Sequence, residues 1–230
     1  LSDEDLEKEV LLMTDRYTPE LFDAVVDLGG IALVNNYSRL VIDPERFEGD
    51  EKEVMASKGM GVIYTRTAYQ QVLRRDLPTK EREELLSTYY MPYHKAIESE
   101  VERILGQFDR CLIIDCHSFP SKPLPYELDQ DLNRPKICFG TDSFHTPKEL
   151  IGAALSFCEA NGIKVAIDKP FAGSYVPIEY LGKDERVSSI MIEVNRGLYM
   201  NEETGIKSTR FIRTKELISN IVHNIITDYG

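Results

Sequence analysis

Two kinds of hydrophobic pattern alternate along this chain. In one kind, apolar residues form short continuous runs, which are typical of strands buried inside a sheet. In the other kind, apolar residues recur every three or four positions, which is typical of helices with one buried face. The runs predict strands at 31–34, 59–67, 111–117, 137–139, 164–167 and 189–194, and the spaced segments predict helices at 2–13, 18–28, 80–107, 146–160 and 208–228.

The alternation of strands and helices predicts an α/β fold. We expect one domain over residues 1–230, with three α/β/α layers and a mixed, largely parallel central sheet. Residues typical of helix ends agree with this pattern. Ser2, Thr18 and Thr146 stand where N-caps are expected, and Gly29-Gly30 and Asn161-Gly162 stand where helices should end.

Charged side chains follow three of the apolar runs directly. Asp115 and His117 end the run at 111–117, and because residues two apart on a strand face the same way, their side chains should project together. Glu193 and Arg66 end two other runs. Ligands of α/β proteins collect at the carboxyl ends of strands, so each residue is a candidate site residue. The alternative is a structural ion pair or, for His117, a hydrogen-bonded structural histidine.

Charge and composition narrow the classes of function. The net charge of -12 at pH 7 argues against binding to nucleic acid or to an anionic membrane surface. No apolar run approaches the roughly 20 residues that span a bilayer. The four cysteines form no Cys-x-x-Cys pair, which is typical of reduced thiols in a cytoplasmic protein.

The candidate chemistry is metal-assisted hydrolysis. A histidine and a carboxylate at the mouth of a sheet can hold a metal ion and its water, and a separate glutamate can take the proton of that water. Neither a Gly-x-Gly-x-x-Gly motif, a P-loop nor a Gly-x-Ser-x-Gly motif is present. Ser118 is disfavoured as a nucleophile because neighbouring residues on a strand face opposite ways.

Six short segments occur in a characteristic order across nearly the whole chain. They are Thr14-Asp15 with Leu21, Ser38-Arg39-Leu40-Val41-Ile42-Asp43, Gly61-Val62-Ile63-Tyr64-Thr65-Arg66-Thr67, Asp115-Cys116-His117-Ser118-Phe119, Pro170-Phe171-Ala172-Gly173, and Glu193-Val194-Asn195-Arg196-Gly197-Leu198-Tyr199-Met200. Together they resemble the N-formylglutamate amidohydrolase family, which is related in fold to the zinc carboxypeptidases.

The resemblance implies a zinc carboxypeptidase-like fold and a site for zinc or another divalent metal. His117 would be one metal ligand, and Asp15 would be a second, with a helix-end cap as the alternative for Asp15. Glu193 would be the general base. A further set of residues is expected to bind the substrate: Arg39, Arg66, Arg134, Asn195 and Arg196. At least two of these arginines are expected to meet in one pocket that holds a carboxylate.

Two departures from the family pattern bear on the site. The family usually carries a Pro-His-Ser-Gly-like segment near its start, and its histidine should be a further metal ligand. None of the four histidines occupies that place. Because the chain starts at Leu1 and not at Met, we expect the segment to precede it; the alternative is that the site has lost a ligand. The family also often has Asn-Arg where this chain has Glu45-Arg46. Outside the motifs, His94 is expected to be a packing or surface residue, His223 to be structural, and His145 to be structural or a substrate contact.

The resemblance therefore predicts a metal-dependent amidohydrolase. Its substrate would be a small anionic N-acyl amino acid such as N-formyl-L-glutamate, and its products would be formate and glutamate. One alternative is a carboxypeptidase-like metallopeptidase with an open cleft for a peptide. A second is an inactive homologue that keeps the arginines and binds acidic metabolites. The acyl group, the identity of the metal and the oligomeric state stay open.

Overall fold

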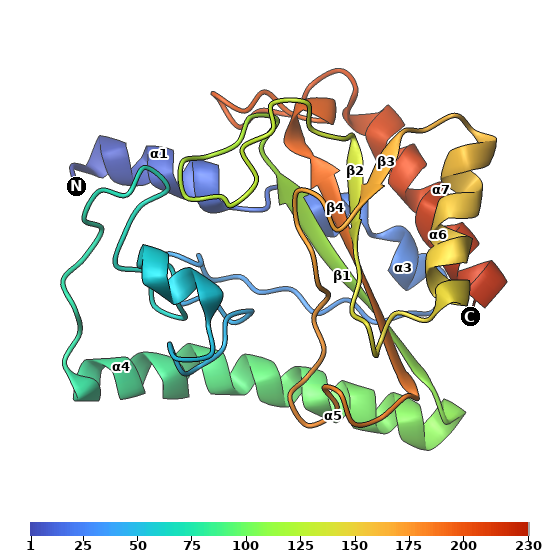
Figure 1. Ribbon diagram of the computed structural model, residues 1–230, viewed down its shortest axis with the longest axis horizontal. Coiled ribbons are helices and arrows are strands. Elements are labelled where there is room, and N and C mark those ends of the chain that lie inside the picture. The colour runs from blue at the N-terminus through green and yellow to red at the C-terminus, as the bar shows by residue number, and fades with distance from the viewer. Residues whose placement is uncertain (230) are drawn as a thin grey trace. The chain divides into compact units, whose positions relative to one another are not determined.

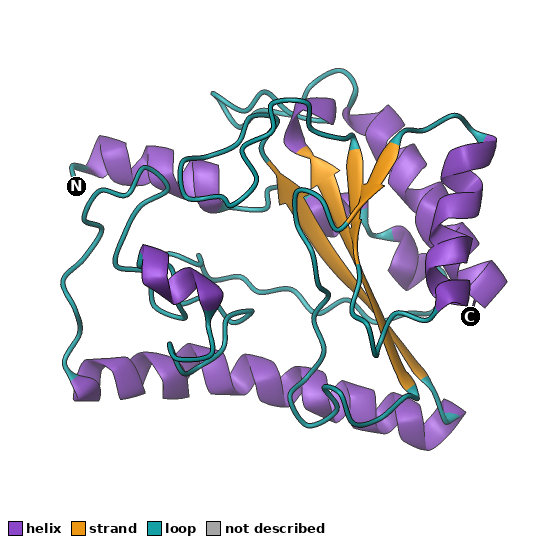
Figure 2. Cartoon of the chain, in the orientation of Figure 1, coloured by secondary structure: helices purple, strands orange, loops and turns teal. Residues whose placement is uncertain are grey.

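The computed structural model describes residues 1–229, which form two compact units. Unit 1 contains residues 1–14, 35–100 and 124–130, and unit 2 contains residues 15–34, 101–123 and the chain from 131 onward. The predicted α/β class is confirmed (Figures 1 and 2). The prediction that the whole chain is a single domain stays a prediction.

Unit 2 is built on a four-stranded sheet with the strand order β1-β4-β2-β3. Its strands are β1 (Cys111–Phe119), β2 (Ile137–Gly140), β3 (Val165–Ile167) and β4 (Val187–Asn195). The pairs β1–β4 and β2–β3 are parallel, whereas β2–β4 is antiparallel. The mixed, largely parallel sheet expected from the sequence is therefore present.

Strand β4 is the centre of this unit because every one of its nine residues is buried. It lies between β1 and β2, which satisfy its backbone groups on both edges. Helices α6 (Lys148–Ala160) and α7 (Phe211–Tyr229) pack against each other beside the sheet (Figure 1). Their apolar faces supply Leu150 and Ala154 from α6 and Ile218, Ile221 and Ile225 from α7, all buried.

The predicted helix at 18–28 is wrong in detail, because the structure divides it into α2 (Thr18–Leu21) and α3 (Ala24–Asp27). The break allows the adjacent side chains of Leu21 and Phe22, which point different ways on a continuous helix, both to be buried. Thr18 is not the N-cap. Tyr17 precedes the helix in a left-handed conformation (φ 68°), and the Thr18 hydroxyl donates to the carbonyl of Asp15.

The predicted strand at 31–34 is also wrong. The segment forms no ladder, and Ile31, Leu33 and Val34 are 43–46% exposed. An apolar run predicts burial, but a strand also needs a neighbouring strand to pair with its N–H and C=O groups. Within the part of the chain that the structure describes, no helix has the length and apolar character needed to cross a membrane.

Unit 1 contains α1 (Asp3–Met13), the 3-10 turn η1 (Val54–Lys58) and α4 (Thr79–Leu85). Helix α4 continues through the π-helical turn η2 (Leu86–Tyr90) into α5 (Met91–Phe108), which confirms the long helix predicted at 80–107 (Figure 2). Ser2 caps α1 as expected, because its hydroxyl accepts the backbone N–H of Asp5.

The predicted strand at 59–67 is a loop that folds back on itself. The carbonyl of Gly59 accepts the N–H groups of both Thr65 and Arg66, and Arg66 forms only an isolated bridge with Val72. Two apolar clusters fill the unit around this loop. One contains Met13, Leu40, Met55, Met60, Tyr64, Ala68 and Leu124, and the other contains Ile42, Val62, Ile63 and Leu86.

All four cysteines are free thiols, as expected from their spacing. Cys111, Cys138 and Cys158 are buried, and burial raises the pKa of each thiol to about 11. These thiols therefore stay protonated near neutral pH and behave as small apolar side chains.

His145 is a structural residue of unit 2, which settles the two interpretations left open by the sequence in favour of the first. Its side chain is 1% exposed. The backbone N–H of Gly182 donates to Nε2 at 2.8 Å, so the ring proton is on Nδ1, which donates to the carbonyl of Val187 at 2.7 Å. One ring thus joins the loop before β4 to the start of that strand.

We predict that His145→Ala lowers the free energy of unfolding by about 2–5 kcal/mol, because it leaves a cavity, the buried carbonyl of Val187 without its partner, and the N–H of Gly182 without its ring acceptor. Urea denaturation at pH 7 measures the change. His223→Ala is the matched control, since His223 is exposed on α7 and its replacement should change stability by no more than about 0.5 kcal/mol. Equal, small losses in both variants would contradict the structural role of His145.

Candidate active site

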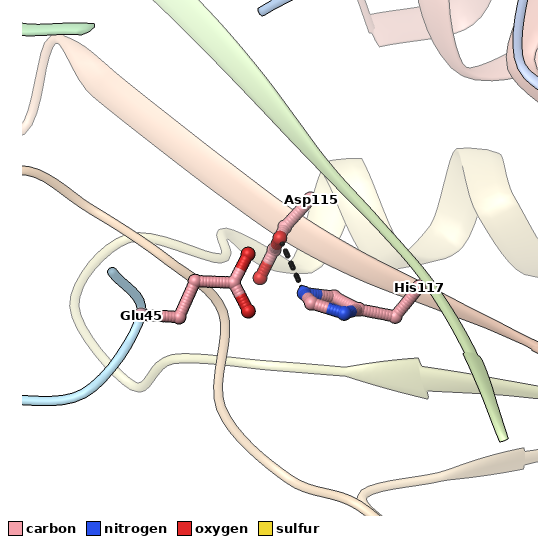
Figure 3. A group of neighbouring side chains, drawn as sticks. All are labelled: Glu45, Asp115 and His117. Carbon is pink, nitrogen blue, oxygen red and sulfur yellow. Dashed lines mark ion pairs between the residues drawn. The ribbon is translucent and has the colours of Figure 1, made fainter. Parts of the chain in front are cut away.

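His117 and Asp115 form the centre of the candidate site, near the carboxyl end of β1. Both residues project from the same face of the strand, as the sequence predicted. Nε2 of His117 lies 2.9 Å from Oδ1 of Asp115, and Figure 3 shows the carboxylate turned toward the ring. The other oxygen of Asp115 accepts the backbone N–H of Tyr175 at 3.0 Å, which fixes the carboxylate. Asp115 therefore holds the imidazole ring in one orientation.

Asp15 approaches the other ring nitrogen of His117. Its Oδ2 lies 3.6 Å from Nδ1 of His117. Its Oδ1 accepts the backbone N–H of Ser118 at 2.9 Å and the hydroxyl of Ser118 at 2.7 Å. These bonds are possible because β1 is the last strand of the order β1-β4-β2-β3, so one edge of the strand faces no other strand of this sheet. Asp15 thus binds along that edge.

The turn that carries Asp15 is fixed from its other side. The hydroxyl of Tyr199 donates to the carbonyl of Arg16, and the hydroxyl of Tyr17 donates to the carbonyl of Gly205. The ring of Tyr17 also packs edge-on against Tyr199 and Phe211. Burial raises the pKa of Tyr199 to about 12, so this hydroxyl remains a donor throughout the neutral range. Asp15 is therefore presented by a rigid turn.

Arg196 follows β4 and is enclosed within the same group. Its side chain is 6% exposed. Nη2 lies 3.2 Å from Oδ1 of Asp15 and 3.2 Å from the carbonyl of Ser118, and Nε donates to the Ser118 hydroxyl at 3.0 Å. The predicted role of Arg196 in binding substrate stays a prediction, but its guanidinium group already has a protein carboxylate as a partner.

Glu193 stands beside His117 in the sheet. The two residues are paired in the parallel register of β1 and β4, so they project from the same face on strands about 4.8 Å apart. Glu193 is also paired with Cys138 of β2, and it is 6% exposed. Asn195, two residues further, uses its side-chain amide to donate to Pro135 and its oxygen to accept the N–H of Gly197.

The loop at 169–175, which includes the family segment Pro170-Phe171-Ala172-Gly173, contributes to this face. The carbonyl of Phe171 accepts from Cys138, and the N–H of Tyr175 donates to Asp115. Gly140 allows the approach, because a Cβ atom there would collide with the carbonyl of Gly173.

Arg134 is positioned by the aromatic side chains next to the loop. Its guanidinium carbon lies 5.7 Å from the ring centres of both Phe119 and Phe171, and Nη1 donates to the carbonyl of Pro120 at 3.2 Å. At these distances the guanidinium charge lies within cation–π range of both rings. Because Phe119 is two residues beyond His117 on β1, it projects from the same face of the sheet as His117.

The donor atoms around His117 are suited to a divalent metal ion. Two ligands of a tetrahedral zinc ion, each bonded at 2.0–2.2 Å, lie about 3.4 Å apart. The 3.6 Å between Nδ1 of His117 and Oδ2 of Asp15 is close to that separation. The 2.9 Å contact to Asp115 is instead a hydrogen-bond distance, and a carboxylate bonded to the second nitrogen is the usual support of a metal-bound histidine. His117 and Asp15 can therefore act as ligands, with Asp115 as their support.

Unit 1 contains a separate group of buried charges that includes the predicted substrate residue Arg39. Asp43 is 3% exposed and accepts the hydroxyl of Tyr64 at 2.7 Å. Its carboxylate lies 4.0 Å from Nη1 of Arg39 and 3.7 Å from Nε of Arg46. Burial alone would raise the pKa of Asp43, but the two arginines and the Tyr64 hydrogen bond outweigh it and hold the pKa below 3.8.

Two other residues of interest from the sequence also lie in unit 1. Arg66 is exposed. Glu45, which Figure 3 labels, uses its backbone N–H to donate to Asp43. The expected convergence of arginines on one pocket stays a prediction, since Arg39 and Arg66 belong to unit 1 while Arg134 and Arg196 belong to unit 2.

We predict that Asp43→Asn lowers the free energy of unfolding at pH 7 by about 3–5 kcal/mol, because two arginines lose their buried carboxylate. A carboxyl group whose pKa is depressed by folding stabilises above its unfolded pKa and loses that effect as the pH falls through its folded value. The difference between wild type and variant should therefore be complete at pH 7 and shrink below about pH 3.8.

Urea unfolding at pH 7 and at pH 3 measures this difference. Glu4→Gln is the control, because Glu4 pairs with Lys8 on the exposed surface of α1, where ion pairs contribute about 1 kcal/mol or less. A difference between wild type and Asp43→Asn that is the same at both pH values would contradict the assignment.

Two residues of this site were not assigned roles from the sequence. The pattern placed Asp115 beside His117 without a separate function, and it considered Ser118 only as a nucleophile. In the structure the Ser118 hydroxyl is bonded to Asp15 and Arg196. The pairing of residues two apart on a strand was the available signal for Asp115, whereas no local signal links Ser118 to residues so distant in the sequence.

Comparisons with known proteins place this arrangement in context. The family model of N-formylglutamate amidohydrolase matches residues 2–200. An N-formylglutamate deformylase from Pseudomonas aeruginosa is 28% identical over 203 residues, which cover 86% of this chain and 74% of that protein. An N-formylglutamate deformylase from Pseudomonas putida is 28% identical over 195 residues, with 82% and 71% covered.

Two solved structures share the fold. The crystal structure of N-formylglutamate amidohydrolase from Ralstonia eutropha JMP134 superposes with a TM-score of 0.81 at 22% identity, covering 96% of this chain and 85% of that one. A gene product from Agrobacterium tumefaciens superposes with a TM-score of 0.69 at 16% identity, covering 99% and 79%. At these identities the similarity establishes the fold.

Proposed function

Because the chain belongs to the N-formylglutamate amidohydrolase family, we propose that it hydrolyses the amide bond of an N-formylated acidic amino acid. N-formyl-L-glutamate is the proposed substrate, since both curated relatives are named as its deformylases, and the products are formate and glutamate. We further propose that the reaction uses a bound divalent metal ion, with zinc as the first candidate.

The observation that carries this proposal is the position of His117 between two carboxylates, with a third carboxylate level with it on the next strand. Asp115 supports the ring through Nε2, and Asp15 stands near Nδ1. Glu193 is paired with His117 across β1 and β4. A metal amidase needs separate groups that bind the metal, support the metal ligand and accept the proton of the water.

In the proposed mechanism, His117 and Asp15 would hold the metal ion, which when bound would polarise the formyl carbonyl and acidify a water molecule. Glu193 removes a proton from the attacking water as the water oxygen bonds to the formyl carbon. The same carboxyl group then gives the proton to the amide nitrogen as the carbon–nitrogen bond breaks. Two products leave, the amine of glutamate and formate, and Glu193 is ionised again.

Arginine residues are proposed to select the acidic substrate. Arg134 is the first candidate of unit 2, because Phe119 and Phe171 both lie within cation–π range of its guanidinium group, whose planar shape suits a carboxylate. Arg39 and Arg66 remain candidates from unit 1, and Asn195 and Arg196 remain candidates from the sequence.

The proposal is tested by measuring formate release from N-formyl-L-glutamate, with N-formyl-L-glutamine as a substrate of similar shape that keeps the α-carboxylate and lacks the side-chain charge. We predict preference for the acidic substrate, loss of activity when a chelator removes the metal, and recovery when zinc is added. Absence of formate release from the acidic substrate by zinc-loaded protein would overturn the substrate assignment. Full activity in protein shown by elemental analysis to be free of metal would overturn the metal assignment.

We predict that Glu193→Gln lowers turnover about 10²–10⁴-fold, because the amide keeps the shape of the side chain and cannot accept the proton. Zinc content and thermal midpoint should stay close to those of wild type, since Glu193 is not proposed as a ligand. A structural ion pair would give the opposite result, with a lower midpoint and near-normal turnover. Measuring turnover, zinc content and midpoint on one preparation separates the two roles.

A further inference from the structure

We propose that Arg196 and Ser118 are positioning residues that aim the carboxylate of Asp15 at the metal site. This inference rests on the proposed function, because it assigns Asp15 as a ligand. It also gives Arg196 a role different from binding the substrate carboxylate.

Three donors converge on one oxygen of Asp15. Oδ1 accepts the Ser118 N–H at 2.9 Å, the Ser118 hydroxyl at 2.7 Å and Nη2 of Arg196 at 3.2 Å. Since these bonds fix Oδ1, the plane of the carboxylate cannot turn freely about its own axis. The remaining oxygen, Oδ2, is the one that lies 3.6 Å from Nδ1 of His117. The donors therefore decide which oxygen is offered to a metal ion.

Arg196 is built into the protein and not directed at solvent. Besides Asp15, it bonds the hydroxyl and the carbonyl of Ser118, and its side chain is 6% exposed. Three of its bonds thus go to two residues of the candidate site. A substrate carboxylate that approached Nη2 would have to compete with the carboxylate of Asp15, and Nε is already bonded to the Ser118 hydroxyl.

The charge of Arg196 and its hydrogen bonds should have opposite effects on the affinity of Asp15 for a metal ion, and the test must separate the two effects. The positive charge of Arg196 weakens the attraction of Asp15 for a cation, whereas its hydrogen bonds fix the ligand oxygen. Arg196→Lys keeps the charge and removes the planar fork that bonds Asp15 and Ser118 together. Ser118→Ala removes one donor to Asp15 without any change in charge. A common effect of both variants therefore reports on geometry.

The experiment measures the zinc affinity of the full chain by competition with a chromophoric chelator, in the absence of substrate. Support groups of metal ligands typically contribute 10–100-fold in affinity, so we expect zinc binding by Arg196→Lys and Ser118→Ala to weaken by about that factor. Arg186→Lys is the matched control, because Arg186 forms an exposed ion pair with Asp109 and Asp184. Its zinc affinity should equal that of wild type.

Unchanged zinc affinity in folded Arg196→Lys and Ser118→Ala, with a raised KM for N-formyl-L-glutamate in Arg196→Lys, would overturn the inference and assign Arg196 to the substrate. The proposed function would survive that result. If wild type itself bound no zinc, the metal part of the proposed function would fail together with this inference. Circular dichroism and thermal midpoint verify folding, and if Arg196→Lys does not fold, the zinc affinity of Ser118→Ala decides.

Discussion

The parallel pairing of β1 with β4 is the interaction on which the candidate site depends. This register places His117 level with Glu193, so both side chains lie near the carboxyl ends of their strands. A shift of one residue would turn one side chain to the opposite face. The buried apolar residues of β4 resist such a shift, because they would have to exchange places with its polar residues. The core of unit 2 therefore determines the geometry of the chemistry.

A second constraint joins a turn near the start of the chain, and the turn after β4, to strand β1. Asp15 belongs to a turn fixed by Tyr17 and Tyr199, and Arg196 is the residue directly after β4. Both meet at Ser118, whose N–H, hydroxyl and carbonyl are all used. Three distant segments thus hold one carboxylate, and such preorganisation avoids an entropic cost when a ligand binds.

The sequence predicted the elements that are marked by a continuous apolar run or by apolar residues at regular spacing. The apolar runs at 111–117 and 189–194 and the spaced apolar residues of 80–107 and 208–228 led to the correct strands and helices. The segment 31–34 failed because strand formation depends on a partner that the pattern does not contain. The bonds of Asp15 to Ser118 and Arg196 join residues 103 and 181 positions apart, so only the folded chain reveals them. The family resemblance named the candidate site residues, and the structure showed which side chains and backbone groups they bond.

The position of β1 at the end of the strand order has a consequence for association between molecules. An edge strand offers unpaired N–H and C=O groups to which a strand of another chain can add. At the carboxyl end of β1, the N–H of Ser118 is bonded to Asp15 and its carbonyl to Arg196. The residues that shape the candidate site therefore also occupy backbone groups to which a strand of another chain could pair. Loss of Asp15 would leave the N–H of Ser118 unpaired at this edge, in addition to removing a candidate ligand.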